Sequence, residues 1–240
     1  MKQLIVNADD FGFSEAGDEA IRDLLEAGLI TSASTVFNQK NTESALAYIR
    51  RRSERCFGIH LNLSEGQFLS DPARELVYTV SYAKFYLSLT LSDRLAYLQE
   101  IECQLDYGLQ HFAATHLDGH HHIHAFPLYW LPVMRAACRR GLRYVRNTYT
   151  FFRGDDLYKV AARRVYRALL RRYGLRTTDY FFDLRYFIEH MAEVDRLPED
   201  CSIEVMCHPQ AGNEDYHFLA SRDMRKIAGR FQLVSYATVR

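Results

Sequence analysis

Residues 4–37, LIVNADDFGFSEAGDEAIRDLLEAGLITSASTVF, decide the fold because they contain one complete strand–helix–strand unit. The apolar run at 4–8 predicts a buried strand, and residues 30–37, which are rich in β-branched side chains, predict a second one. Between them, Ser14 can cap a helix that Gly28 ends. Units of this kind are typical of parallel sheets.

The alternation of strand and helix continues along the rest of the chain. Apolar and β-branched runs predict further strands at 56–63, 114–119, 142–146, 180–184, 203–207 and 231–235. Helical spacing predicts helices near 41–53, 91–109, 128–140, 156–173, 186–195 and 219–229. For the 156–173 helix we predict an apolar stripe of Val160, Ala161, Val165, Ala168, Leu169 and Tyr173.

About seven or eight parallel strands favour an α/β fold of the closed or irregular (β/α) barrel type. A doubly wound sheet is the alternative, but the turn NADDFGFS lacks the GxGxxG pattern of dinucleotide-binding folds. No linker interrupts the pattern, so we expect a single domain over residues 1–240. The irregular, aromatic-rich segment 64–90 is a candidate lid or short insertion.

Composition limits the classes of partner. Lys plus Arg and Asp plus Glu both number 30, so the basic excess of a nucleic-acid binder is absent. No apolar run approaches the roughly 20 residues of a membrane span. The five cysteines are scattered without a CxxC pair, and MKQLIVNADDFG lacks the pattern of a secretory signal. We therefore expect a cytoplasmic protein with reduced thiols that binds neither nucleic acid nor a membrane.

Chemically active side chains lie in, or directly after, four of the predicted strands. Asp9 and Asp10 end the first strand, His60 belongs to the third, and His208 follows the 203–207 strand. The segment 111–124 contains six of the ten histidines. Since the carboxyl ends of parallel strands meet at one edge of a sheet, these groups are expected to converge there.

Each group also has a plain structural interpretation. A pair of aspartates can form a turn, a lone histidine can belong to the core, and a histidine before proline can be a turn residue. The joint occurrence favours a metal site. Along an extended backbone neighbouring side chains alternate, so His120, His121 and His122 are not expected to bind one ion together. One carboxylate and two imidazoles would leave positions for water and substrate, as in catalytic metal sites.

Five motifs carry a family resemblance. NADDFGFS, GIHLNLSEG, THLDGHHHIHAFP, TTDYFF and EVMCHP, in this order, resemble the YdjC-like (ChbG/HpnK) carbohydrate deacetylases. The resemblance extends from residue 4 to about residue 210. It implies a (β/α) barrel distantly similar to polysaccharide deacetylases. It also implies metal-dependent removal of acetyl from N-acetylated sugars, such as N-acetylglucosamine mono- or oligosaccharides.

The resemblance also implies roles for individual residues. Three of them, Asp10, His60 and His120, would hold one divalent ion, with Asp9 as general base and His208 as general acid. The other matching residues would orient these groups or bind substrate: Arg146, Asp118, His122 and His124. Two imidazoles suit Zn²⁺, whereas the family resemblance allows Mg²⁺, so both metals stay open.

Two other functions fit parts of the sequence. A metal-dependent phosphoesterase could use the basic stretch 139–176, which has twelve Arg or Lys against Asp155 and Asp156, although we favour a solvated helix face as its explanation. A non-catalytic sugar- or metal-binding module would need a missing base or acid. The aromatic stretches 78–86 and 149–152 suit either contact with sugar rings or packing within the protein. If they are exposed together, they would suit the interface of a homodimer.

Overall fold

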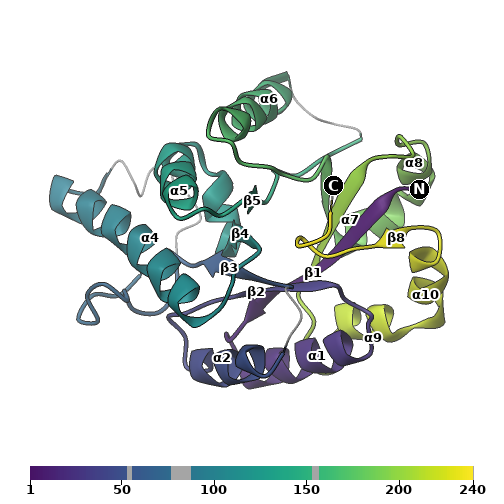
Figure 1. Cartoon of the computed structure of the whole chain (residues 1–240), viewed down its shortest axis with the longest axis horizontal. Helices are drawn as coiled ribbons and strands as arrows, with labels where there is room; N and C mark the ends of the chain where they lie inside the picture. The colour runs from purple at the N-terminus through teal and green to yellow at the C-terminus, as the bar shows by residue number, and fades with distance from the viewer. Residues whose placement is uncertain (53–55, 77–87, 153–156, 240) are drawn as a thin grey trace.

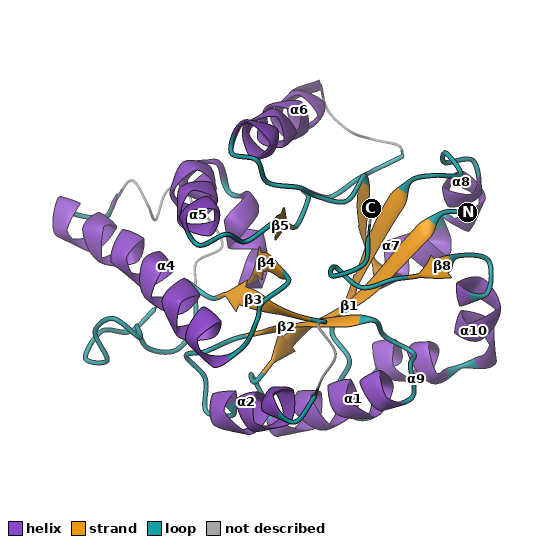
Figure 2. Ribbon diagram, viewed as in Figure 1, coloured by secondary structure: helices purple, strands orange, loops and turns teal. Residues whose placement is uncertain are grey.

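A parallel sheet forms the centre of the protein. The computed structural model describes residues 1–52, 56–76, 88–152 and 157–239, and within these ranges the sheet has eight strands. Figure 2 shows these strands with helices around them. In chain order they are β1 (Gln3–Phe11), β2 (Ser32–Thr35), β3 (Phe57–Leu61), β4 (His116–Gly119), β5 (Tyr144–Val145), β6 (Tyr180–Asp183), β7 (Ser202–Cys207) and β8 (Gln232–Leu233).

Helices cover the outer side of the sheet (Figure 1). α1, α2 and α9 lie together on one side, α4 and α5 on a second, and α6 on a third. The described helices are α1 (Glu15–Glu26), α2 (Thr42–Arg50), α4 (Leu91–His111), the 3₁₀ helix η1 (His120–Ala125), α5 (Pro127–Arg139), α6 (Leu157–Arg172), α7 (Leu184–Glu189), α8 (Met191–Asp195), α9 (Glu214–Ala220) and α10 (Arg222–Ala228).

The strands form a half-barrel rather than a closed ring. Their order is β5-β4-β3-β2-β1-β7-β6, all pairs are parallel, and β8 pairs with β1. The edge strands β5 and β6 are joined through the chain that follows β5, where the Thr150 N–H donates to the Phe181 carbonyl at 2.9 Å. The predicted parallel α/β fold of the irregular barrel type is confirmed.

The two faces of β1 have different surroundings. Leu4, Val6 and Ala8 are completely buried in the main core. Ile5 instead packs in a second cluster with Tyr144, Val234, Tyr236 and Val239. Because side chains alternate along a strand, Asn7 and Asp9 share the face of Ile5. The C-terminal segment thus fills one end of the half-barrel, and the polar end of β1 lies towards the other.

Two predicted helices differ from the structure. The helix predicted near 219–229 corresponds to α10, but a separate helix, α9, precedes it: α9 begins where the Asn213 side chain accepts the Tyr216 N–H, and Ser221 starts α10 by accepting the Met224 N–H. Both residues are good N-caps, so each begins a separate helix. The helix predicted at 186–195 is divided at His190 into α7 and α8.

The predicted apolar stripe of α6 is only partly correct: Leu169 and Tyr173 pack against the core, but Ala161, Val165 and Ala168 are exposed. Val165 is 51% exposed, and the buried side chains of this helix are Tyr166 and Leu170. The Tyr166 hydroxyl donates to the carbonyl of Arg146 at 3.0 Å, which fixes the rotation of the helix against the sheet. Apolar residues occur on several sides of α6, so the spacing alone does not identify the packed side.

Part of the candidate lid can be described. Residues 64–76 are irregular, with one antiparallel bridge between Gln67 and Glu75. The aromatic stretch 78–86 lies outside the described residues. Among the helices of the described ranges, none combines the length and the apolar character that a membrane crossing needs. All five cysteines are free thiols.

The first turn of α1 contains a buried carboxylate, Asp18, that affects stability. Asp18 is 1% exposed and accepts the Gly12 N–H at 2.6 Å, and burial raises its pKa to about 6. The folded protein therefore binds a proton more tightly than the unfolded chain. The stabilisation is present below the unfolded pKa of 3.8 and is lost as the pH rises towards 6.

We expect Asp18→Asn to remove this pH dependence, because an amide keeps the oxygen that accepts the Gly12 N–H but carries no buried charge. The variant should be more stable than the parent by about 1 kcal/mol at pH 7. Urea unfolding between pH 4 and 7 measures the difference, which should grow up to about pH 6. A difference that is constant over this range would contradict the prediction.

Candidate active site

Three predicted metal ligands meet at the carboxyl ends of the strands. Asp10 Oδ1 lies 2.8 Å from His120 Nδ1 and 3.2 Å from His60 Nε2. These ligand atoms all lie within 4.8 Å of one another. Ligand atoms that share one ion at about 2.1 Å are roughly 3.0–3.4 Å apart. The three side chains, which come from β1, β3 and η1, therefore have the spacing of a mononuclear metal site.

The orientation of His60 supports a cation at this position. Its Nδ1 lies 2.8 Å from Asp118 Oδ1, and its buried Nε2 is turned towards Asp10 Oδ1. Burial lowers the pKa of His60, but the charges of Asp118 and Asp9 outweigh it and raise the pKa to about 10. A histidine held by a carboxylate with its other nitrogen open is the usual arrangement of a metal ligand.

The backbone at Asp10 is unusual for a strand. Its φ of 65° lies in the left-handed region, and the pairing of β1 with β2 is irregular between Ala8 and Phe11. This kink ends the regular strand at the point where the two carboxylates follow one another. Asp9 stays buried, at 2% exposed, while the Asp10 side chain is 24% exposed and faces the metal ligands.

Asp9 is fixed by a buried arginine. Arg146 NH1 and NH2 donate to the two oxygens of Asp9, each at 2.6 Å, and Asn7 Nδ2 donates to Oδ1 at 2.9 Å. Burial raises the pKa of Asp9, but the charge and hydrogen bonds of Arg146 together with the charge of His60 outweigh burial and hold the pKa below its usual value. Arg146 also lies 2.7 Å from Asp118 Oδ2. One guanidinium thus orients both Asp9 and the carboxylate that holds His60.

Arg146 is held in turn by Glu204 and Tyr236, which the sequence did not reveal. Arg146 Nε donates to Glu204 Oε1 at 2.7 Å, and the Tyr236 hydroxyl donates to Glu204 Oε2. Burial raises the pKa of Glu204 to about 7 although Arg146 and Tyr236 oppose it. A lone carboxylate inside the apolar strand IEVMC was the available signal, because an unpaired charge is rarely buried.

The histidine tract is not extended, so the reasoning from strand alternation does not apply to it. Residues 120–125 form the 3₁₀ helix η1, in which His121 and His122 have φ of 49° and 55°. His120 meets Asp10, whereas His122 Nε2 lies 3.0 Å from the Tyr149 hydroxyl. His124 is buried, and burial lowers its pKa to about 3, so it is a neutral core side chain.

His208 faces the same cavity as the aspartates. The cavity has about 220 Å³, and its lining includes Asp9, Asp10, His120, His121, Glu65 and His208. His208 Nε2 lies 3.9 Å from Asp10 Oδ2, and its side chain is 47% exposed. Glu65, which the sequence analysis did not single out, lies 3.4 Å from His120 Nε2. The site therefore combines a metal-ligand triad, a buried carboxylate and an accessible imidazole.

This fold and site define a (β/α) half-barrel with a group of side chains that could hold one metal ion at the carboxyl ends of its strands. A family model described as YdjC-like protein matches residues 3–232, so the chain belongs to the YdjC-like family.

Named relatives cover most of the chain. It is 29% identical over 220 residues to a carbohydrate deacetylase of Clostridium beijerinckii, covering 86% of this chain and 81% of that protein. It is 30% identical over 211 residues, with the same coverage, to a chitooligosaccharide deacetylase of Salmonella paratyphi B. A crystal structure from Enterococcus faecalis V583, of a protein proposed to cleave cellobiose-phosphate, aligns with a TM-score of 0.75 and 20% identity over 99% of this chain and 98% of that one. This last likeness supports the fold.

Proposed function

We propose that the protein is a carbohydrate N-deacetylase, which hydrolyses the acetamide of an N-acetylated sugar with the help of one divalent metal ion. The observation that carries this proposal is the cavity lined by Asp9, Asp10, His120 and His208, with His60 at ligand distance from Asp10 and His120 behind it. The deacetylase names of the relatives from two bacteria support the choice of substrate.

The triad would hold the metal through two imidazole nitrogens and one carboxylate oxygen. The buried Nε2 of His60 fits this role, because it faces Asp10 Oδ1 at 3.2 Å while Asp118 holds Nδ1 on the other side of the ring. A bound divalent ion would polarise the acetamide carbonyl and lower the pKa of water. The nitrogen ligands suit Zn²⁺, and the carboxylates of Asp10 and nearby Glu65 suit Mg²⁺.

Asp9 would act as the general base. Its carboxylate is ionised because Arg146 donates to both of its oxygens, and it lines the cavity beside Asp10. It would take a proton from the attacking water, after which the carbonyl carbon carries both the new oxygen and the sugar nitrogen. Arg146 keeps the carboxylate aimed at this point and disperses its charge.

His208 would act as the general acid. An amine leaves readily only when it is protonated, so the reaction needs a donor on the leaving-group side. The backbone of His208 is anchored by Asp215 Oδ2, which accepts its N–H at 2.7 Å, and by Asn213 Nδ2, which donates to its carbonyl at 2.8 Å. These two contacts hold the half-exposed imidazole at the rim of the cavity.

The test is acetate release from N-acetylglucosamine and its oligosaccharides, with and without a chelator. We expect release that the chelator abolishes and that added Zn²⁺ or Mg²⁺ restores. A chromogenic phosphate ester serves as the comparison substrate. Phosphate release in place of acetate release, or acetate release that the chelator leaves unchanged, would contradict the proposal.

Metal binding can be tested without turnover through His60→Ala. Loss of one of three ligands should lower metal affinity by at least about 10–100-fold, the effect seen even for residues that only support a ligand. Metal content after dialysis measures this. His124→Ala provides the matched control, since His124 is equally buried but does not meet the triad. Equal metal content in the two variants would show that His60 is not a metal ligand.

A further inference from the structure

Glu65, His120 and His121 form a second group of candidate metal ligands in the active-site cavity. Glu65 Oε1 lies 3.4 Å from His120 Nε2 and 3.8 Å from His121 Nε2, and all three side chains line the cavity. Both distances exceed the roughly 2.7–2.9 Å of a charge-assisted hydrogen bond. The first matches the roughly 3.0–3.4 Å between ligand atoms of one ion, and a small rotation of the partly exposed His121 ring would bring the second into that range. The spacing therefore fits a shared cation better than direct pairing.

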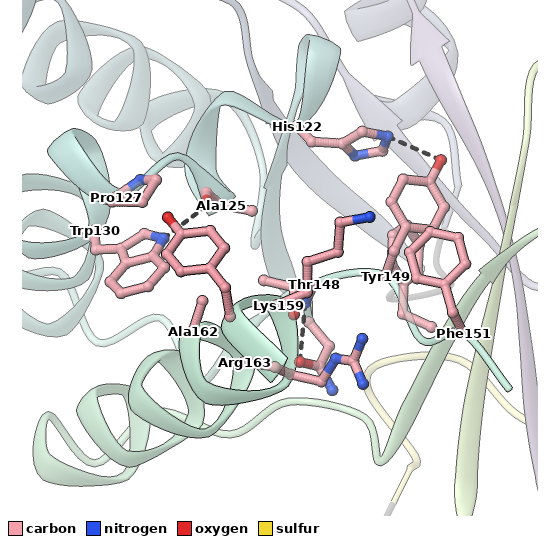
Figure 3. Close-up of a pocket in the computed structure, with 13 residues that line it drawn as sticks. His122, Ala125, Pro127, Trp130, Thr148, Tyr149, Phe151, Lys159, Ala162 and Arg163 are labelled. Atoms are coloured by element: carbon pink, nitrogen blue, oxygen red, sulfur yellow. Dashed lines mark hydrogen bonds between the residues drawn. The ribbon is translucent and has the colours of Figure 1, made fainter. Parts of the chain in front are cut away.

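The backbone at His121 brings two consecutive imidazoles together. Its φ of 49° lies in the left-handed region, which is strained for an L-residue other than Asn or Asp. In an extended strand the side chains of residues 120 and 121 would point to opposite faces, whereas here their ring centroids lie 4.1 Å apart. His122, with φ of 55°, turns away to the Tyr149 hydroxyl in another cavity of about 270 Å³ (Figure 3). Strain of this kind often occurs at functional sites, which is consistent with a role for His121 in the metal cavity.

The His121 ring is oriented by the loop that follows β3. Its Nδ1 lies 3.0 Å from Ser64 Oγ, and the Ser64 hydroxyl donates to Asn62 Oδ1 at 3.3 Å. The Ser64 oxygen is therefore placed to accept the proton of His121 Nδ1. In that tautomer the lone pair is on Nε2, which is turned towards Glu65 Oε1. A histidine held through one nitrogen, with the other facing a carboxylate, has the arrangement of a metal ligand.

The backbone that carries Glu65 is firmly held. Its carbonyl accepts three hydrogen bonds, from Asn62 Nδ2 at 2.8 Å, Gln39 Nε2 at 3.0 Å and Asn38 Nδ2 at 3.2 Å. The next residue, Gly66, has φ of 88°, and a Cβ at this position would lie 2.7 Å from the Asn38 carbonyl oxygen. The Glu65 carboxylate thus extends into the cavity from a fixed backbone, so only its side chain loses freedom when it binds an ion.

We propose that Glu65, His120 and His121 form a second divalent-cation site, which takes a nitrogen-preferring ion such as Zn²⁺ and shares His120 with the catalytic centre. Two imidazoles and one carboxylate favour Zn²⁺ over Mg²⁺. The sharing follows from the orientation of the His120 ring, which turns Nδ1 to Asp10 and Nε2 to Glu65.

Occupation of the second site inhibits the enzyme. When His120 Nδ1 binds the catalytic ion, the proton of the ring is on Nε2, so a second ion there would release this proton to water and draw electron density away from Nδ1. The second ion would also stand in the cavity of about 220 Å³ that the substrate has to enter. This inhibition rests on the proposed function, whereas the binding of the second ion does not.

The second site can be isolated by removing the first. His60 does not belong to the second group of ligands, so His60→Ala leaves that group complete. Calorimetric titration of this variant with Zn²⁺ should show one ion bound per chain, held weakly enough to be lost on dialysis because Glu65 and His121 are partly exposed. Adding Glu65→Gln or His121→Asn should weaken this binding by at least about tenfold. Glutamine leaves the Glu65 carbonyl contacts in place, and asparagine tolerates the left-handed backbone.

Each of these two substitutions has a matched control in the same His60→Ala background. Glu75→Gln changes an exposed glutamate of the same loop that lies outside the lining of the cavity. His122→Asn changes the next left-handed histidine, which faces Tyr149 instead. Both controls should bind Zn²⁺ within about twofold of His60→Ala, since neither removes a ligand. In the protein with His60 intact, acetate release should rise and then fall as Zn²⁺ is added, and Glu65→Gln should remove the fall.

Three results would overturn the proposal. One is the absence of Zn²⁺ binding by His60→Ala in the titration. Another is binding that both Glu65→Gln and His121→Asn leave unchanged, which would assign the ion to other residues. The third is acetate release that does not fall although a second ion binds, which would refute the sharing of His120. Absence of acetate release from every sugar would refute the proposed function instead, and the titrations would still decide whether the second site exists.

Discussion

Asp9→Asn is expected to lower the rate of acetate release by about 10²–10⁴-fold, the usual loss when a general base is removed. The amide is nearly the same size as the carboxylate but cannot accept the proton of the attacking water. Metal content should stay at the level of the parent, because the three proposed ligands are Asp10, His60 and His120. Acetate assays and metal analysis on the same preparation check both parts.

Ser34→Ala is the matched control for this variant. The Ser34 hydroxyl lies 3.5 Å from Asp9 Oδ1 and 3.1 Å from His60 Nδ1, so it belongs to the same polar cluster but is not placed to take the proton. Its removal should cost less than about tenfold in rate. Near-normal acetate release by Asp9→Asn would exclude Asp9 as the base, and loss of metal from that variant would reassign it as a ligand.

Arg146→Met is expected to lower the free energy of unfolding by about 3–5 kcal/mol. The guanidinium is completely buried and is the shared partner of Asp9, Asp118 and Glu204. Methionine fills much of the volume but leaves three carboxylates close together without a counter-charge. Urea denaturation at neutral pH measures the loss. Adding Glu204→Gln to Arg146→Met removes one of the charges and should recover part of the stability.

Arg140→Met tests whether burial is the cause. Arg140 pairs with Glu102 and Asp106, but its side chain is 16% exposed and the Asp106 side chain is 53% exposed. An ion pair in contact with water contributes only about 0–1 kcal/mol. Arg146→Met should therefore lower the free energy of unfolding several-fold more than Arg140→Met. Equal losses of unfolding free energy would show that burial does not increase the contribution of the Arg146 network to stability.

The sequence was most informative where the strands are buried on both faces. Continuous apolar runs such as IEVMC predicted β7 within one residue, because a strand in a parallel sheet has no solvated side. The same argument led to the candidate site, since Asp9, Asp10, His60 and His208 belong to, or directly follow, such runs. The polar residues at the strand ends were expected to converge, and the structure brings Asp9, Asp10 and His208 to one cavity, with His60 in contact with Asp10.

The rest depended on contacts between distant segments. The rotation of α6 follows from the hydrogen bond of Tyr166 to the Arg146 carbonyl, which helical spacing does not encode. Glu204 and Tyr236 look like core or tail residues until the sheet curves and places them behind Arg146. Tyr149 was grouped with aromatic residues suited to sugar contact or packing, and only the structure shows that its hydroxyl lies beside His122.

The left-handed backbone of Asp10 narrows what mutation can do at this position. L-residues lose roughly 1–2 kcal/mol in that conformation, and Asp and Asn tolerate it better than most because their short polar side chains bond locally. Glutamate would keep the negative charge but lacks this tolerance, and glycine would relax the backbone but offers no oxygen. Among the twenty amino acids, only aspartate both tolerates the left-handed backbone and supplies a carboxylate ligand. No single substitution at residue 10 therefore keeps both properties. Asn and Gly fit the backbone best, so they would preserve the fold, but they would remove the anionic ligand from the proposed metal site.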